Sequence, residues 1–162
     1  KKQKKKLEKD IFIKLGSDFS LFFYNRGFLN TLRKIIKLDN KIKLSLLLVY
    51  PNKKCSTKEI YSRVKTYSKK KYFKDNFQSK SKFLKYILKS KNDLQAIVEK
   101  KYPVIQRLLI DINKARGCYL SRMTGSGSAC YGIFTDKNCS KVALKLLRKK
   151  YPKFWFSIAK TI

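Results

Sequence analysis

Hydrophobic positions along the chain recur with two periods, and together they predict alternating helices and strands. Leu7, Ile11 and Leu15 stand four residues apart, which predicts an amphipathic helix over residues 3–15 that ends at Gly16. The apolar run 42–50, closed by Pro51, predicts a buried strand. Residues 21–24 are a shorter strand candidate, and residues 28–38 fit either a strand or a helix.

In the second half of the chain, more residues mark where helices and strands begin and end. Ser56 or Thr57 can cap a helix that runs to about residue 69, and residues 70–80 are polar and predicted to form a loop. Pro103 suits the first turn of a helix and Gly117 its end. The remaining expected helices are 80–89, 92–101, 103–116 and 138–150, and the expected strands are 118–123, 129–135 and 153–159.

From residue 42 onward the expected order is one strand, four helices, two strands, one helix and one strand. This order predicts an α+β fold in which helices cover one face of a mostly antiparallel sheet, in a split βαβ-like arrangement. No internal repeat is present. At 162 residues the chain is long enough for one domain, or for one domain with a piece of another.

A glycine-rich turn, Thr124-Gly125-Ser126-Gly127-Ser128, joins the two predicted strands 118–123 and 129–135. Glycines let a backbone approach an anion closely and adopt positive φ, so N–H groups can converge on a phosphate. A Gly-Ser turn between two strands can equally be a hairpin that binds nothing. Thr124 can donate its hydroxyl to a phosphate or cap the turn.

The charge is strongly positive: 41 basic and 10 acidic residues give +31. Of the basic residues 34 are lysine, whereas planar recognition of phosphates and bases favours arginine. Lysine, Ile, Phe, Tyr and Asn are also the residues that an AT-rich coding sequence produces. We therefore expect no specific nucleic-acid partner. The alternative is a basic nucleic-acid-binding module that stacks bases on its aromatic residues Tyr24, Tyr72, Phe73 and Tyr86.

The four cysteines, at 55, 118, 130 and 139, form no Cys-x-x-Cys pair, and the chain has no histidine. We expect no metal site from them and reduced thiols in a cytoplasmic protein, because neither a signal peptide nor a long apolar run is present. No membrane partner is expected. Without histidine, a general base has to be an Asp or a Glu.

Four segments in order resemble a known family. They are residues 15–23 (Leu-Gly-Ser-Asp-Phe-Ser-Leu-Phe-Phe), Pro51 with 56–61 (Ser-Thr-Lys-Glu-Ile-Tyr), Asn92-Asp93-Leu94 with 102–105 (Tyr-Pro-Val-Ile), and 122–128 (Arg-Met-Thr-Gly-Ser-Gly-Ser). In this order and spacing they resemble the 4-diphosphocytidyl-2-C-methyl-D-erythritol kinase family of the GHMP kinase superfamily, over roughly residues 7–159.

The resemblance implies an enzyme that transfers a phosphoryl group from ATP, with Mg²⁺, to a hydroxyl of a cytidyl diphosphate substrate in non-mevalonate isoprenoid biosynthesis. By resemblance, Asp18 is the base on the attacking hydroxyl, which agrees with the single oriented carboxylate that phosphoryl transfer needs. Residues 124–128 then line the phosphates, and Thr57 and Tyr61 lie near the cytidyl group. By itself Asn92-Asp93 reads as a helix N-cap.

The chain also departs from the family pattern. Ser20 stands where a proline usually follows the aspartate, and residues 30–33 (Asn-Thr-Leu-Arg) replace a Gly-x-Gly-Glu stretch. No segment resembles the family's nucleotide loop or its N-terminal lysine. We therefore expect residues 1–40 to be the tail of an N-terminal kinase domain that is otherwise missing, and 41–162 to be a GHMP kinase C-terminal domain. Alone, the fragment is expected to be inactive. A sister GHMP enzyme, such as a homoserine or mevalonate-type kinase, is the alternative within the superfamily.

Overall fold

The computed structural model describes residues 27–31, 34–37, 42–68, 77 and 79–161. The chain divides into two compact units. One comprises residues 1–41, 70–78 and 162, and the other comprises residues 42–69 and 79–161. The boundary expected near residue 40 separates a kinase-domain tail from a C-terminal domain, and that assignment stays a prediction.

In the first unit the described residues form an antiparallel hairpin of β1 (Gly27–Thr31) and β2 (Lys34–Lys37). Residues 28–38, which fitted a strand or a helix by pattern, are therefore two strands over their described part. The helix expected over 3–15, the strand expected over 21–24 and Asp18 lie outside the described residues.

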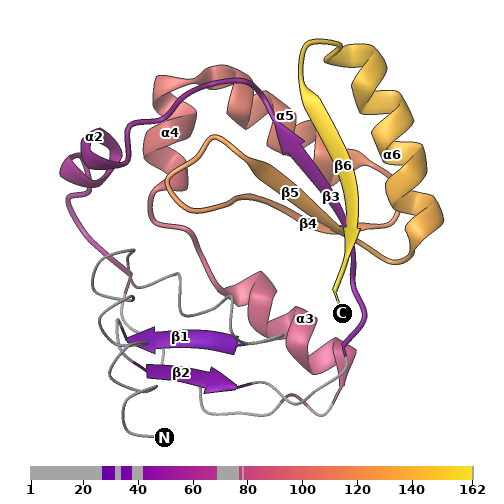
Figure 1. Ribbon diagram of the computed structural model, residues 1–162, viewed down its shortest axis with the longest axis horizontal. Helices are drawn as coiled ribbons and strands as arrows, with labels where there is room; N and C mark the ends of the chain where they lie inside the picture. The colour runs from indigo at the N-terminus through magenta and orange to yellow at the C-terminus, as the bar shows by residue number, and fades with distance from the viewer. Residues whose placement is uncertain (1–26, 32–33, 38–41, 69–76, 78, 162) are drawn as a thin grey trace, which may run out of the picture. The chain divides into compact units, whose positions relative to one another are not determined.

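The second unit contains a four-stranded sheet in the order β4-β5-β3-β6, and every pairing within it is antiparallel (Figure 1). Its strands are β3 (Ser45–Tyr50), β4 (Cys118–Met123), β5 (Cys130–Phe134) and β6 (Trp155–Lys160). β3, the first of these four strands in sequence, is an inner strand that pairs with β5 on one side and with β6, the last strand, on the other. The expected mostly antiparallel α+β fold is confirmed.

Five helices accompany this sheet in the described part of the unit: α2 (Thr57–Ser62), α3 (Lys80–Lys89), α4 (Gln95–Lys101), α5 (Pro103–Lys114) and α6 (Lys137–Lys150). Pro103 opens α5 as expected. Asp136 caps α6 by accepting the Cys139 N–H at 2.8 Å. Three basic residues in the last turn interact favourably with the negative end of the helix dipole.

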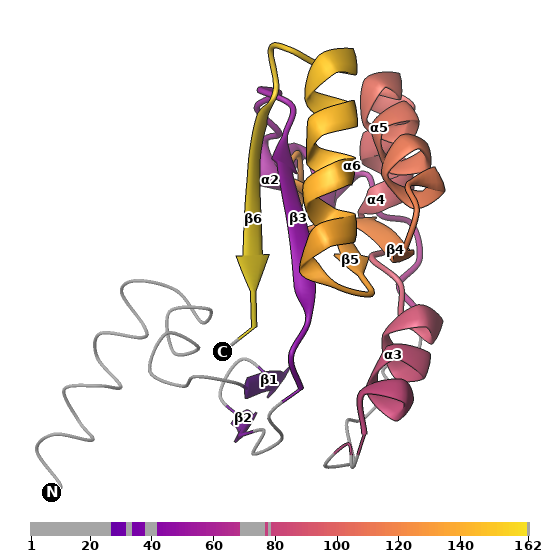
Figure 2. The same cartoon turned by 90° about the vertical axis from the view of Figure 1, so that its right-hand side faces the viewer.

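Helices α4, α5 and α6 pack on one face of the sheet (Figure 2). Alternation along the strands turns Leu47, Val49 and Phe134 toward these helices, and all three side chains are almost fully buried. The core on this face leaves no room at Gly132, because a Cβ there would lie 2.5 Å from Ile112 of α5.

Helix α3 departs from the one-sided arrangement expected from sequence. Its Leu84 packs with Leu44, Leu120 and Ile133. Ile133 pairs with Leu46 and Leu120, whose side chains lie on the face opposite to Leu47. The sheet therefore has helices on both faces, because its second face also carries apolar residues that need cover.

Helix α2 ends at Ser62, although the pattern predicted a helix to about residue 69. The Arg63 N–H bonds the Ile60 carbonyl and closes the last turn at 3.2 Å. The following residues run on without helical structure to Ser68, whose backbone N–H donates to Asp93 at 2.9 Å. The segment that follows the helix is thus held by a tertiary contact at Ser68.

Candidate functional site

The glycine turn joins β4 to β5, as the sequence predicted. The Thr124 N–H donates to the Ala129 carbonyl at 2.8 Å, and the Gly127 N–H donates to the Thr124 carbonyl at 3.1 Å. Gly125 and Gly127 have φ values of 55° and 90°, which residues with a side chain rarely adopt. The backbone N–H groups of Gly125, Ser126 and Ser128 donate to no residue among those described.

The turn's second half is packed against the core. A Cβ on Gly127 would lie 2.9 Å from Met123 Sδ, 3.2 Å from Cys55 Sγ and 3.3 Å from Val98. Ser128 is buried, and its hydroxyl donates to the Lys53 carbonyl. The Ser128 hydroxyl is thus used inside the fold. A phosphate at this turn would meet backbone N–H groups and the exposed Thr124 hydroxyl instead.

Helix α2 lies beside the turn and carries both residues expected near a cytidyl group. Thr57 Oγ1 is 2.9 Å from Ser126 Oγ, so the first residue of the helix contacts the middle of the turn. Ser56 caps the helix by accepting the Glu59 N–H, and Ile60 is fully buried beneath it. Tyr61 is 50% exposed. The structure therefore brings Thr57 and the glycine turn together.

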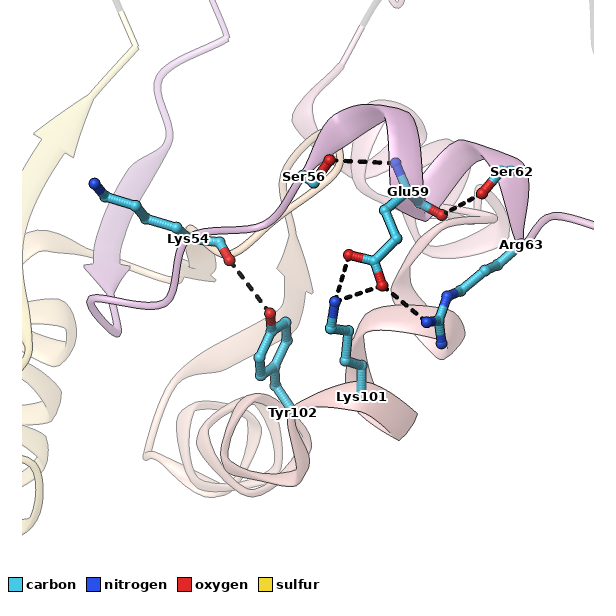
Figure 3. Close-up of polar contacts among 7 residues, drawn as sticks. All are labelled: Lys54, Ser56, Glu59, Ser62, Arg63, Lys101 and Tyr102. Atoms are coloured by element: carbon cyan, nitrogen blue, oxygen red, sulfur yellow. Dashed lines mark hydrogen bonds and ion pairs between the residues drawn. The ribbon is translucent and has the colours of Figure 1, made fainter.

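Charged contacts attach α2 to α4 (Figure 3). Lys101 Nζ lies 2.5 Å from both oxygens of Glu59, and Arg63 Nη2 lies 2.8 Å from one of them. The hydrogen bond from Lys101 lowers the pKa of Glu59, and the same bond raises the pKa of Lys101. Tyr102 also donates its hydroxyl to the Lys54 carbonyl at 3.3 Å, just before the helix (Figure 3).

A cavity of about 460 Å³ lies next to the turn. Of the site residues expected from the sequence, Tyr61, Thr124 and Gly125 line it. Thr57, Ser126, Gly127 and Ser128 are not among its lining residues. The pattern did not assign the other side chains on its wall, which are Tyr67, Lys91, Asn92, Asp93, Leu94, Arg122, Met123 and Tyr131.

The cavity is lined by tyrosine rings, by the two cations Lys91 and Arg122, and by the carboxylate of Asp93. Arg122 spans from β4 to the end of α3, where it donates to Ser90 Oγ at 3.0 Å and to the Ile87 carbonyl at 3.1 Å. Asp93 is the only carboxylate among the described lining residues, and two hydrogen bonds from Ser68 lower its pKa. Both oxygens of Asp93 already accept hydrogen bonds from Ser68.

Neither Asn92 nor Asp93 occupies the N-cap position of a helix, which was expected from the sequence. Helix α4 begins at Gln95, its N-cap residue is Leu94, and that cap makes no side-chain hydrogen bond. Asn92 Oδ1 accepts the Leu94 N–H, while its amide nitrogen reaches the glycine turn. A polar pair before a helix looks the same in sequence whether it caps that helix or contacts a distant loop.

The cysteines are free thiols. Burial raises the pKa of Cys118 to about 11 and that of Cys130 to about 12. Among the described residues, no three acidic or cysteine side chains gather closely enough to hold a metal ion. In the same part of the chain, no helix is long and apolar enough to span a membrane.

Comparison with known proteins shows which family the chain resembles. Residues 74–153 match the family model described as "GHMP kinases C terminal". A 4-diphosphocytidyl-2-C-methyl-D-erythritol kinase of Pelagibacter ubique (strain HTCC1062) is 34% identical over 162 residues, covering 99% of this chain and 57% of the relative. One from Rhodopseudomonas palustris (strain BisB18) is 41% identical over 64 residues, covering 40% of this chain and 21% of the relative.

A solved structure agrees on the fold. The crystal structure of a 4-(cytidine 5'-diphospho)-2C-methyl-D-erythritol kinase superposes with a TM-score of 0.57 at 17% identity, covering 78% of this chain and 46% of that one. The chain thus spans about half the length of the longer relatives that it matches. Residues 74–153 thus resemble the C-terminal domain of GHMP kinases, and along its length the chain is similar to 4-diphosphocytidyl-2-C-methyl-D-erythritol kinases.

Proposed function

We propose that this chain is the C-terminal part of an ATP-dependent kinase that phosphorylates a hydroxyl of 4-diphosphocytidyl-2-C-methyl-D-erythritol in non-mevalonate isoprenoid biosynthesis. The observation that carries the proposal is the contact between α2 and the glycine turn, made by Thr57 and Ser126. This contact joins residues 56–61 and 122–128, two segments that resemble the family independently of each other. Residues 1–40 would then be the tail of the N-terminal kinase domain.

In this proposal the turn from Thr124 to Ser128 faces the phosphates of ATP. Its support is the pair of glycines with positive φ and the three backbone N–H groups that bond no described residue. Such a concave backbone suits an anion. Mg²⁺, when bound, would neutralise charge on the transferred phosphoryl group, and the described residues offer no cluster of acidic ligands for it.

Tyr61 would supply a stacking face for the cytosine ring, because it is half exposed on the wall of the cavity beside the turn. Lys91 and Arg122 on the same wall give the cavity a positive character that fits a diphosphate. Asp18 would orient the attacking hydroxyl and accept its proton. Asp93, the carboxylate on the described cavity wall, is instead bonded to Ser68 through both oxygens.

The test is a coupled ATPase assay on the chain joined to its upstream coding region, with and without the cytidyl substrate. We expect turnover that depends on the substrate and is lost in Asp18→Asn, while the matched variant Asp10→Asn keeps it. The 162-residue chain alone should show none. Turnover with homoserine or mevalonate instead would replace the proposed substrate, and a folded protein without any turnover would overturn the kinase assignment.

The cytidyl contact has its own test. Tyr61→Ala should raise the KM for the cytidyl substrate by about 5- to 100-fold, the scale of a lost base-aromatic stack, while the KM for ATP stays unchanged. Tyr61→Phe keeps the ring and should keep the KM. If both substitutions raised this KM equally, the interaction would be made by the hydroxyl group rather than by the ring.

A further inference from the structure

Asn92 and Asp93 join α3 to α4, and the proposed function gives them no part. They line the cavity beside the glycine turn. Leu94, which follows them, is buried in the core with Val98, so the pair stands on a fixed base. Their side chains reach two different walls of the cavity.

Asn92 holds the glycine turn. Its amide nitrogen donates to the Met123 carbonyl at 3.0 Å and to the Gly125 carbonyl at 2.9 Å, on either side of Thr124. Its oxygen accepts the Leu94 N–H at 3.0 Å, which leaves the amide in one orientation. Gln95 adds a third link, since its Oε1 accepts the Met123 N–H at 3.0 Å.

The bond to Gly125 has a consequence for anion binding. In a trans peptide the C=O and N–H groups point in opposite directions. Because Asn92 draws the Gly125 carbonyl toward itself, the Ser126 N–H of the same peptide unit faces away from Asn92. That N–H is one of the three in the turn that donate to no described residue. Asn92 therefore orients a candidate phosphate donor without contacting the phosphate.

Asp93 holds another part of the cavity lining, next to Tyr67. Its two oxygens accept the Ser68 backbone N–H at 2.9 Å and the Ser68 hydroxyl at 2.5 Å. Ser68 follows Tyr67, which lines the cavity, and the segment leads back to α2 and Tyr61. The carboxylate thus fixes a stretch that has no secondary structure of its own.

We propose that Asn92 and Asp93 are positioning residues that hold the two walls of the cavity, Asn92 the phosphate side and Asp93 the cytidyl side. The proposal rests on the proposed function for its kinetic consequences, but the two anchors themselves can be measured without it. It predicts that the two side chains affect different kinetic constants, which a general structural role would not do.

The test compares Asn92→Asp with Asn113→Asp, an exposed position on α5. Asn92→Asp keeps the shape but replaces two donors by an acceptor that repels the Met123 and Gly125 carbonyls. In the chain joined to its upstream region, we expect kcat to fall by about 10- to 100-fold, as for misplaced reacting groups, with little change in the KM for the cytidyl substrate. Asn113→Asp should behave as the parent. Loss of kcat in both variants, or in neither, would overturn the proposal.

The Asp93 side is tested by Asp93→Ala, which removes both bonds to Ser68, and by Ser68→Ala, a milder change at an exposed residue that removes the hydroxyl bond alone. Here the KM for the cytidyl substrate should rise severalfold with kcat unchanged. Hydrogen exchange on the 162-residue chain gives a readout that needs no activity. Exchange should accelerate at 124–127 in Asn92→Asp and at 64–68 in Asp93→Ala. Unaltered exchange at both sites overturns the anchoring, whereas altered exchange in a protein without turnover overturns only the kinase assignment.

Discussion

The hydroxyl oxygens of Thr57 and Ser126 lie 2.9 Å apart, although 69 positions separate the two residues in sequence. This contact joins the first residue of α2 to the middle of the glycine turn. It is exposed, so its value lies in fixing the helix beside the turn more than in stabilising the fold. A hydrogen bond of this kind contributes about 0.5–1.5 kcal/mol at most.

Replacing Thr57 by Val removes that bond while keeping the shape of the side chain. We expect a loss of about 0.5–1 kcal/mol in the free energy of unfolding, measured by urea denaturation, because the partner hydroxyl can turn to water. Thr57→Ser keeps the hydroxyl and should retain the stability. If the two substitutions cost the same, the methyl group, not the hydrogen bond, is what stabilises this site.

Gly125 and Gly127 both have positive φ but differ in the space around them. Gly125→Ala meets nothing within 4 Å and should cost about 1–2 kcal/mol from backbone strain alone. Gly127→Ala adds contact with Met123, Cys55 and Val98, and should cost roughly 2–5 kcal/mol. Urea unfolding of the two variants checks the order. A Gly127→Ala protein as stable as Gly125→Ala would show that the core beneath the turn yields easily.

Lys101 is expected to be the main ion-pair partner of Glu59. It bonds both carboxylate oxygens, whereas Arg63 is an exposed neighbour one helical turn away. Glu59→Gln and Lys101→Met should each lower the folding equilibrium constant by no more than about fivefold, as surface pairs do. The double variant should lose less than the sum of the two. Additive losses in this cycle, measured by thermal unfolding, would mean that the pair contributes nothing as a pair.

Acid should destabilise the described domain in a defined range. Four carboxylates have lowered pKa values: Glu59 through Lys101, Asp93 through Ser68, Asp136 through the Cys139 N–H, and Asp111, where burial opposes the shift but bonds from Lys150 and Tyr151 outweigh it. A lowered folded pKa gives stability that is present above the unfolded pKa of about 4 and is lost as pH falls through the folded value.

We therefore expect a level free energy of unfolding between about pH 5.5 and 8, since the chain has no histidine, and a decline below about pH 4.5. Urea unfolding at a series of pH values measures it. The net charge of the chain also rises in acid and acts in the same direction, so Asp93→Asn is the control. That variant should show a shallower decline, and an identical pH profile would remove Asp93 from the explanation.

Much of the second unit could be predicted from the sequence, because the residues that begin and end its helices and strands lie within those elements or next to them. Strand 118–123 and helix 80–89 have the bounds expected from their apolar patterns, and Pro103 marks the start of α5. The side of the sheet that α3 covers could not be predicted, since an amphipathic helix shows that it has an apolar face but not which surface that face meets.

The candidate site was predicted only where a residue has an unusual backbone or a family resemblance. Glycines at 125 and 127 signalled the turn by themselves. Asn92 lies in a segment that resembles the family, but its contact with the turn could not be predicted, because an asparagine in a loop can bond its own helix, a turn or a distant carbonyl with equal ease. Arg122 was likewise hidden, since its partner Ile87 contributes a backbone carbonyl, which every residue has.

The strand order has a consequence for how the protein is made. β3 is the first strand of its sheet to leave the ribosome, yet its partners are β5 and β6, and Leu44 exchanges hydrogen bonds with Thr161, 117 positions later. β3 has no partner strand until β5 has been synthesised at residue 134, and one of its edges stays unpaired until β6 has been synthesised at residue 160. Such distant pairings slow folding, and a nascent chain halted before β6 would expose the edge of its own central strand to aggregation.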